Sequence, residues 1–241
     1  MNLPRLARPA IVLSVLVFLP LVFGSMQMYP GGTSWDHASV GHDFWKNYLC
    51  DLLRPTALDG VPNPLGSALA KTATLMLACG LFSFFYVVGR EFPSLPRLGR
   101  AVAVLGALSS CAVPGVVFVS GDRYGIFHGV AVIVAAIPGL SAALLAVVGL
   151  ALGEDRPKRG AFVGAATLAV ALVDFALYVP QVLSSAPGPI AVAVLERIAL
   201  GLVLVWMCVV AALRPAGASD RGRERRGEAS RDGGREVRAG A

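Results

Sequence analysis

Charged residues are scarce in this sequence. Only 15% of the 241 residues are Asp, Glu, Lys or Arg, whereas 56% are hydrophobic, and the mean hydropathy is +0.68. In soluble globular domains about a quarter of the residues are charged. The composition therefore excludes a soluble domain and predicts an integral membrane protein.

Sequence motifs of common catalytic and metal sites are also absent. The chain contains no H-E-x-x-H, G-x-S-x-G or Walker sequence, and its four cysteines show no C-x-x-C spacing. His37 and His42 are five residues apart in a loop, whereas two ligands on one helix face stand at i and i+4. We therefore predict no bound metal and no cofactor.

Long hydrophobic runs are what the sequence has in abundance. A helix needs about 20 apolar residues to cross a hydrocarbon core about 30 Å thick. Six runs meet this length: 9–28, 65–88, 101–120, 126–152, 161–183 and 190–213. The first is too long for a signal peptide and lacks an A-x-A-like cleavage site after it, so we interpret it as an uncleaved span. The expected fold is all-α, a polytopic bundle of six transmembrane helices that forms one domain over 9–213.

Basic residues are divided unevenly between the two sides of this bundle. Cytoplasmic loops of membrane proteins are enriched in Lys and Arg. If the N-terminal segment 1–8 is inside, most of the 21 basic residues are cytoplasmic, and the outer loops hold only Lys46, Arg54 and Arg123. Both termini are therefore predicted to be cytoplasmic. The Ala-, Gly- and Arg-rich composition, without eukaryotic sorting motifs, favours a multi-pass protein of a bacterial plasma (inner) membrane.

The C-terminal segment 215–241 differs in composition from the rest of the chain. It has almost no bulky apolar residues, so we predict a disordered, Arg-rich cytoplasmic tail. Its arginines are mixed with acids, whereas nucleic-acid and lipid-binding tails carry denser basic blocks. We therefore expect no nucleic-acid partner, and the sequence identifies no protein partner.

The first outer loop, 29–64, contains apolar residues at helical spacing. One face of a helix over 43–54 would carry Phe44, Trp45, Tyr48, Leu49, Leu52 and Leu53. The opposite face would carry His42, Asp43, Asn47, Cys50, Asp51 and Arg54. This pattern predicts an amphipathic helix in the membrane interface that ends before Pro55.

Ionisable residues also occur in or beside the spans, where they are rare and usually face a bundle interior or a wet cavity. All of them fall in the outer half of the predicted bundle. Together with one acid of the loop they form a candidate polar, ligand-binding pocket, which the 43–54 helix would cover. Its residues are Asp51, Lys71, Asp122, His128, Asp174, Glu196 and Arg197. The alternative is that Lys71–Asp174 or Asp174–Arg197 are structural ion pairs; the sequence leaves both open.

Two stretches resemble a known family. The first, "NYLCDLLRPTALDGVPNPLGSALAK", is similar to the N-x-x-S-D-L…N…G element of the integral-membrane family called domain of unknown function 998. The matching residues are Asn47, Asp51, Asn63 and Gly66. Cys50 stands where that family commonly has Ser. The second, "VFVSGDRYGIFHGVAVIVA", with Asp122 and His128, resembles the family's outer turn. The resemblance covers most of 9–213 and implies a fold, a topology and an outer polar site, but no established reaction.

Three functions are compatible with these patterns. The first expectation is a membrane protein that binds a membrane lipid or a small amphiphile in an outward-facing polar pocket. The second is an intramembrane metal-dependent hydrolase, with His128 as acid or base and Asp51 or Asp122 as its partner. It rests on a loose likeness to hydrolases of the alkaline-ceramidase type, whose paired histidines on a late span are missing here. The third is a structural scaffold. No catalytic residue is assigned.

Overall fold

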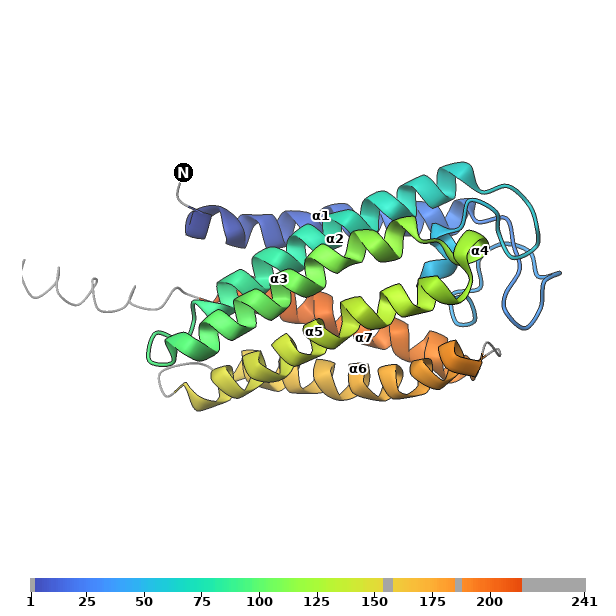
Figure 1. Cartoon of the computed structure of the whole chain (residues 1–241). Coiled ribbons are helices and arrows are strands. Elements are labelled where there is room, and N and C mark those ends of the chain that lie inside the picture. The colour runs from blue at the N-terminus through green and yellow to red at the C-terminus, as the bar shows by residue number, and fades with distance from the viewer. Residues whose placement is uncertain (1–2, 154–157, 185–187, 214–241) are drawn as a thin grey trace, which may run out of the picture. The chain divides into compact units, whose positions relative to one another are not determined.

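Six long α-helices dominate the structure, a computed structural model that describes residues 3–153, 158–184 and 188–213 (Figure 1). All contacts reported below lie within the unit Met1–Ala211. The long helices are α1 (Leu3–Met28), α2 (Pro64–Gly89), α3 (Pro96–Phe118), α5 (Ile126–Leu152), α6 (Arg159–Ser184) and α7 (Ile190–Ala212). Two short elements accompany them, the 3-10 helix η1 (Leu49–Leu53) and α4 (Gly121–Tyr124).

Each of the six long helices is long and apolar enough to cross a membrane. At 1.5 Å per residue they extend over about 35–40 Å, which exceeds a hydrocarbon core of about 30 Å. No strand is formed by the described residues. The predicted fold class, an all-α bundle of six transmembrane helices, is confirmed. The predicted disordered tail, 215–241, lies outside the described residues.

Proline and glycine set several helix boundaries. Pro64 and Pro96 begin α2 and α3. The first N–H groups of a helix have no intrahelical acceptor, so proline, which has no N–H, loses no hydrogen bond there. Between α3 and α5 the chain forms the single turn α4. Gly125 follows it with a φ of 52°, in a region that favours glycine, and separates α4 from α5.

The segment between α1 and α2, residues 29–63, is where the structure departs from prediction. The expected amphipathic helix over 43–54 is absent: the chain forms a turn at 44–46 and then only the 3-10 helix η1. Asn47 and Asp51, predicted on the polar face of that helix, are 0% and 6% exposed, whereas Trp45, predicted on its apolar face, is 54% exposed. A 3-10 helix repeats every three residues, so faces assigned at 3.6 residues per turn no longer hold.

The 29–63 segment is nevertheless firmly attached to the bundle. Leu52, Leu53 and Ala57 pack in one buried cluster with Phe18 of α1 and Ala70 of α2. The hydroxyl of Ser67 in α2 also donates to the carbonyl of Leu53 at 2.7 Å. These contacts place η1 against α1 and α2, and Leu200 and Leu204 of α7 pack against the same cluster.

At the opposite end, Arg8 joins three parts of the chain. Its Nη1 donates to the carbonyls of Val210 and Ala211 at 2.8 and 3.2 Å, at the C-terminal end of α7. Its Nη2 pairs with Glu91 Oε1 at 2.6 Å, just after α2. The last carbonyls of a helix lack intrahelical donors and carry partial negative charge, so a guanidinium is well suited to this position.

Small residues allow α2 and α3 to approach each other closely. A Cβ added to Gly99 in α3 would collide with the carbonyl oxygen of Gly89 in α2. A Cβ added to Gly89 would likewise collide with the carbonyl oxygen of Gly99. Backbone carbonyls cannot move aside as flexible side chains can. Helix pairs in membranes commonly use such small residues, because close contact replaces the missing hydrophobic driving force.

We expect Gly99→Ala to destabilise the bundle by about 1–3 kcal/mol, the usual range for overpacking. Gly115→Ala, on the same helix, is the matched control, since a Cβ at Gly115 meets nothing within 4 Å. Thermal unfolding of both variants in detergent measures the difference. Equal midpoints for the two variants would show that the α2–α3 contact is looser than described.

Candidate functional site

An elongated cavity of about 440 Å³ lies among the long helices and under η1. Along α7 its lining runs from Val192 to Trp206, which is about 20 Å at 1.5 Å per residue. Most of the lining side chains are aliphatic or aromatic, among them Phe18, Leu77 and Phe84. The cavity is therefore a narrow apolar space along the helices.

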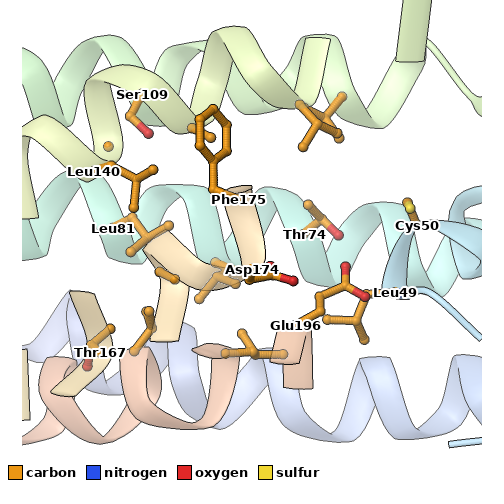
Figure 2. Close-up of a pocket in the computed structure, with 18 of the residues that line it drawn as sticks. Leu49, Cys50, Thr74, Leu81, Ser109, Leu140, Thr167, Asp174, Phe175 and Glu196 are labelled. Atoms are coloured by element: carbon orange, nitrogen blue, oxygen red, sulfur yellow. Dashed lines mark hydrogen bonds between the residues drawn. The ribbon is translucent and has the colours of Figure 1, made fainter. Parts of the chain in front are cut away.

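The polar side chains of the cavity gather toward the η1 end. Figure 2 shows the carboxyl groups of Asp174, from α6, and Glu196, from α7, entering the space near Thr74 and Leu49. The side chains of Tyr48, Cys50 and Tyr178 also contribute to this end. Leu81, Leu140 and Thr167 lie toward the other end of the view.

The serine and threonine hydroxyl groups of the lining are already hydrogen-bonded to the backbone. Ser109 Oγ donates to the carbonyl of Ala135 at 2.8 Å, across the α3–α5 contact. Thr74 and Thr167 donate to the carbonyls of Ala70 and Val163, one turn back on their own helices, each at 2.8 Å. Because these protons are used, the hydroxyls add little polarity to the cavity wall.

Glu196 connects the cavity to the segment above it. Its Oε2 accepts a hydrogen bond from the backbone N–H of Leu49 at 2.8 Å and one from Arg197 Nη1 at 3.2 Å. Leu49 begins η1, whose residues Cys50, Leu52 and Leu53 also line the cavity. The carboxylate of Glu196 thus holds η1 in place as the cover of the polar end.

Asp174 has no such partner. Among the described residues, none forms a hydrogen bond or an ion pair with its carboxyl group, and its Oδ1 is buried. The neighbouring lining residues on α6, Ala171, Phe175 and Tyr178, are at i−3, i+1 and i+4, on the same face of the helix. A carboxyl group in this setting is costly to leave ionised and alone.

Asp51 lies close to the cavity but does not line it. Its Oδ2 accepts hydrogen bonds from the backbone N–H of Tyr48 at 2.8 Å and from Asn47 Nδ2 at 3.2 Å. Burial raises the pKa of Asp51, and these two hydrogen bonds offset part of that rise. Asp51 therefore organises the turn that carries Tyr48 and Cys50 to the cavity wall.

Arg197 likewise lies outside the lining. Besides Glu196 it contacts the carbonyl of Ala193 at 2.9 Å and places its guanidinium over the ring of Phe44, 5.5 Å from the centroid. Burial, together with the charge of Arg197, lowers the pKa of His42 to about 4. Arg197, on α7, thus contacts the 29–63 segment through Phe44.

The remaining predicted site residues, Lys71, Asp122 and His128, are not part of the cavity wall. The ring of His128 contacts the carbonyl of Val119 through Nδ1 at 2.6 Å, which ties the start of α5 to the end of α3. Neither predicted alternative pair, Lys71–Asp174 or Asp174–Arg197, occurs among the described residues, where Arg197 pairs with Glu196 instead. Of the seven predicted site residues, Asp174 and Glu196 line the cavity, and Arg197 pairs with Glu196 from outside the lining.

The geometry offers little to the metal-dependent alternative. Within the described residues, no group of three or more His, Cys, Asp or Glu side chains is close enough to hold a metal ion. Asp51, Asp122 and His128 therefore form no ligand set there. A hydrolase of that kind has no candidate centre in this part of the chain.

Several lining residues were not predicted, notably Tyr48, Thr74 and Tyr178. Tyr178 follows Asp174 at i+4, and Val192 and Leu200 flank Glu196 at i−4 and i+4. This spacing, counted from the two acids, was the available signal for the lining of α6 and α7. No comparable signal marks Thr74, which lies three residues after Lys71.

Replacing Glu196 should loosen the cover. In a variant whose other cysteines are removed, we expect Glu196→Ala to raise the rate of Cys50 labelling by a hydrophilic maleimide about tenfold or more. The Leu49 N–H and Arg197 lose their acceptor, which costs about 1–3 kcal/mol. In the unmodified protein labelling is slow, because burial, and then Glu196 and Asp51, raise the pKa of the Cys50 thiol.

Glu196→Gln is the matched control, since it removes the same charge but keeps an acceptor for the Leu49 N–H. It should label much closer to the unmodified rate. If the Ala and Gln variants label equally fast, the hydrogen bond to Leu49 does not hold the cover.

Comparisons of the chain with protein-family models, with curated proteins and with solved structures found no match. The resemblance to domain of unknown function 998 therefore stays a prediction, and the site is interpreted from its own geometry.

Proposed function

We propose that this protein binds one molecule of a single-chain membrane amphiphile in the cavity between its helices. The observation that carries the proposal is the division of the cavity into a long apolar part and a polar end with two carboxyl groups. A volume of about 440 Å³ falls within the range of about 300–1,000 Å³ for small-molecule sites. An alkyl chain would occupy the apolar part, with its head group near Asp174 and Glu196.

The polar end must provide the selectivity of such a site. For a ligand that leaves water, each buried methylene group would contribute about 0.8 kcal/mol to the free energy of binding. Lipid tails are as apolar as the cavity wall, so an amphiphile that leaves the bilayer gains little from its chain. Its head group therefore decides whether it binds, through the carboxyl groups and the covering segment.

We place the polar end at the outer face of a bacterial plasma membrane, with both termini cytoplasmic. The uneven distribution of Lys and Arg supports this orientation. The covered end of the cavity lies at the 29–63 segment, so an amphiphile would enter from the outer leaflet.

Filling the cavity tests this proposal. We expect Ala171→Phe, which adds a ring to the cavity wall, to remove amphiphiles that co-purify with the protein in mild detergent. Ala169→Phe is the matched control, because Ala169 lies on the same helix, is exposed and does not line the cavity. Mass spectrometry of the extracted molecules gives the readout.

The control should retain what the unmodified protein carries, while Ala171→Phe loses at least one species. Both variants must show the same elution volume and unfolding midpoint for the comparison to count. If the folded Ala171→Phe protein carries the same molecules in the same amounts, or if the unmodified protein carries none, the proposal is wrong.

A further inference from the structure

We infer that the bound amphiphile carries a cationic nitrogen and that this nitrogen pairs with Asp174. The inference rests on the proposed amphiphile binding and adds the chemical class of the head group. It follows from which charges line the cavity, which of them are already neutralised, and how much space is available.

The signs of the lining charges point to a cation. Asp174 and Glu196 are acidic, and no Lys, Arg or His among the described residues lines the cavity. Lys71, His128 and Arg197 all lie elsewhere. A phosphate or carboxylate head group would approach two carboxyl groups without meeting a basic side chain in the wall, and like charges at close range repel.

The two acids are not equivalent. Glu196 is engaged with the Leu49 N–H and with Arg197, so its charge is already balanced. Asp174 has neither a hydrogen bond nor an ion pair within the described part of the chain, and its Oδ1 is buried. An ammonium group beside Asp174 would supply both the missing charge and a hydrogen-bond donor, which offsets the cost of a lone buried carboxylate.

Space limits the ligand to one chain. If each non-hydrogen atom occupies about as much volume as a water molecule in the liquid, about 30 Å³, the cavity holds on the order of 15 such atoms. That suits a single alkyl chain with a small head, and it is too little for a phospholipid with two chains. The ammonium group is then that of a long-chain amine, because a lysophospholipid has more atoms than the cavity holds and would bring its phosphate to the two carboxyl groups.

Four probes of equal chain length test the charge and the size of the head group: dodecylamine, dodecanol, laurate and lauroyl lysophosphatidylethanolamine. Binding is measured by equilibrium dialysis at neutral pH with the full chain in nanodiscs, and empty nanodiscs are subtracted. We expect dodecylamine to bind at least about tenfold more tightly than dodecanol, the effect of one charge-assisted hydrogen bond, and laurate to bind most weakly. The lysolipid, which is larger than the cavity and carries a phosphate, should bind more weakly than dodecylamine.

Isosteric variants test the role of Asp174. Asp174→Asn should lower the affinity for dodecylamine about tenfold and leave dodecanol unchanged, while Asp174→Glu keeps the preference for the amine. Asp122→Asn is the matched control, because it removes an equal charge from a residue outside the cavity wall. The preference of the unmodified protein for the amine over the alcohol is an independent readout if Asp174→Asn does not fold.

The two proposals fail in different ways. If no probe binds, the proposed function is wrong and the inference falls with it. If dodecanol binds as tightly as dodecylamine, or laurate binds best, the cavity takes amphiphiles but Asp174 does not select a cation. An unchanged affinity of folded Asp174→Asn for dodecylamine also overturns the inference.

Discussion

The carboxylate of Glu196 is the point at which the membrane helices and the 29–63 segment meet. It lies on α7, where one of its oxygens receives both the Leu49 N–H and Arg197. An ionised group at this depth is costly unless it is paired and hydrogen-bonded, and these two donors meet both needs. The Leu49 N–H belongs to η1. The position of η1 over the cavity therefore depends on the need of Glu196, in a transmembrane helix, for hydrogen-bond donors.

The same arrangement closes the opposite end of the bundle. There a guanidinium, that of Arg8, pairs with Glu91 and with the last carbonyls of α7. At both ends, then, an arginine pairs with a carboxylate and also donates to backbone carbonyls of α7. Asp174 stands apart from this pattern: it lines the cavity and its Oδ1 is buried, but it has no hydrogen-bond or ion-pair partner among the described residues. That contrast is why its carboxyl group is assigned to ligand binding.

The six helices could be predicted from the sequence because only length and hydropathy are required. The depth of each charge along its helix could be predicted as well, since it is a count of residues. The direction of each charge around its helix could not, because helices that are apolar on nearly all sides show no polar stripe. Lys71 and Asp174 were therefore grouped by depth, although only Asp174 lines the cavity. The prediction for the 29–63 segment was wrong for another reason. The side chains of Asn47 and Asp51 are buried and form local hydrogen bonds, and such bonds cannot be recognised from helical periodicity.

A high-resolution structure of the protein purified in native-lipid nanodiscs tests the central claim most directly, through the density inside the cavity. The account predicts one elongated feature that follows α7 from Trp206 to Glu196, with its polar end within hydrogen-bond distance of Asp174. A cavity filled by ordered water along its length, or one closed by inward rotation of its own side chains, would contradict it.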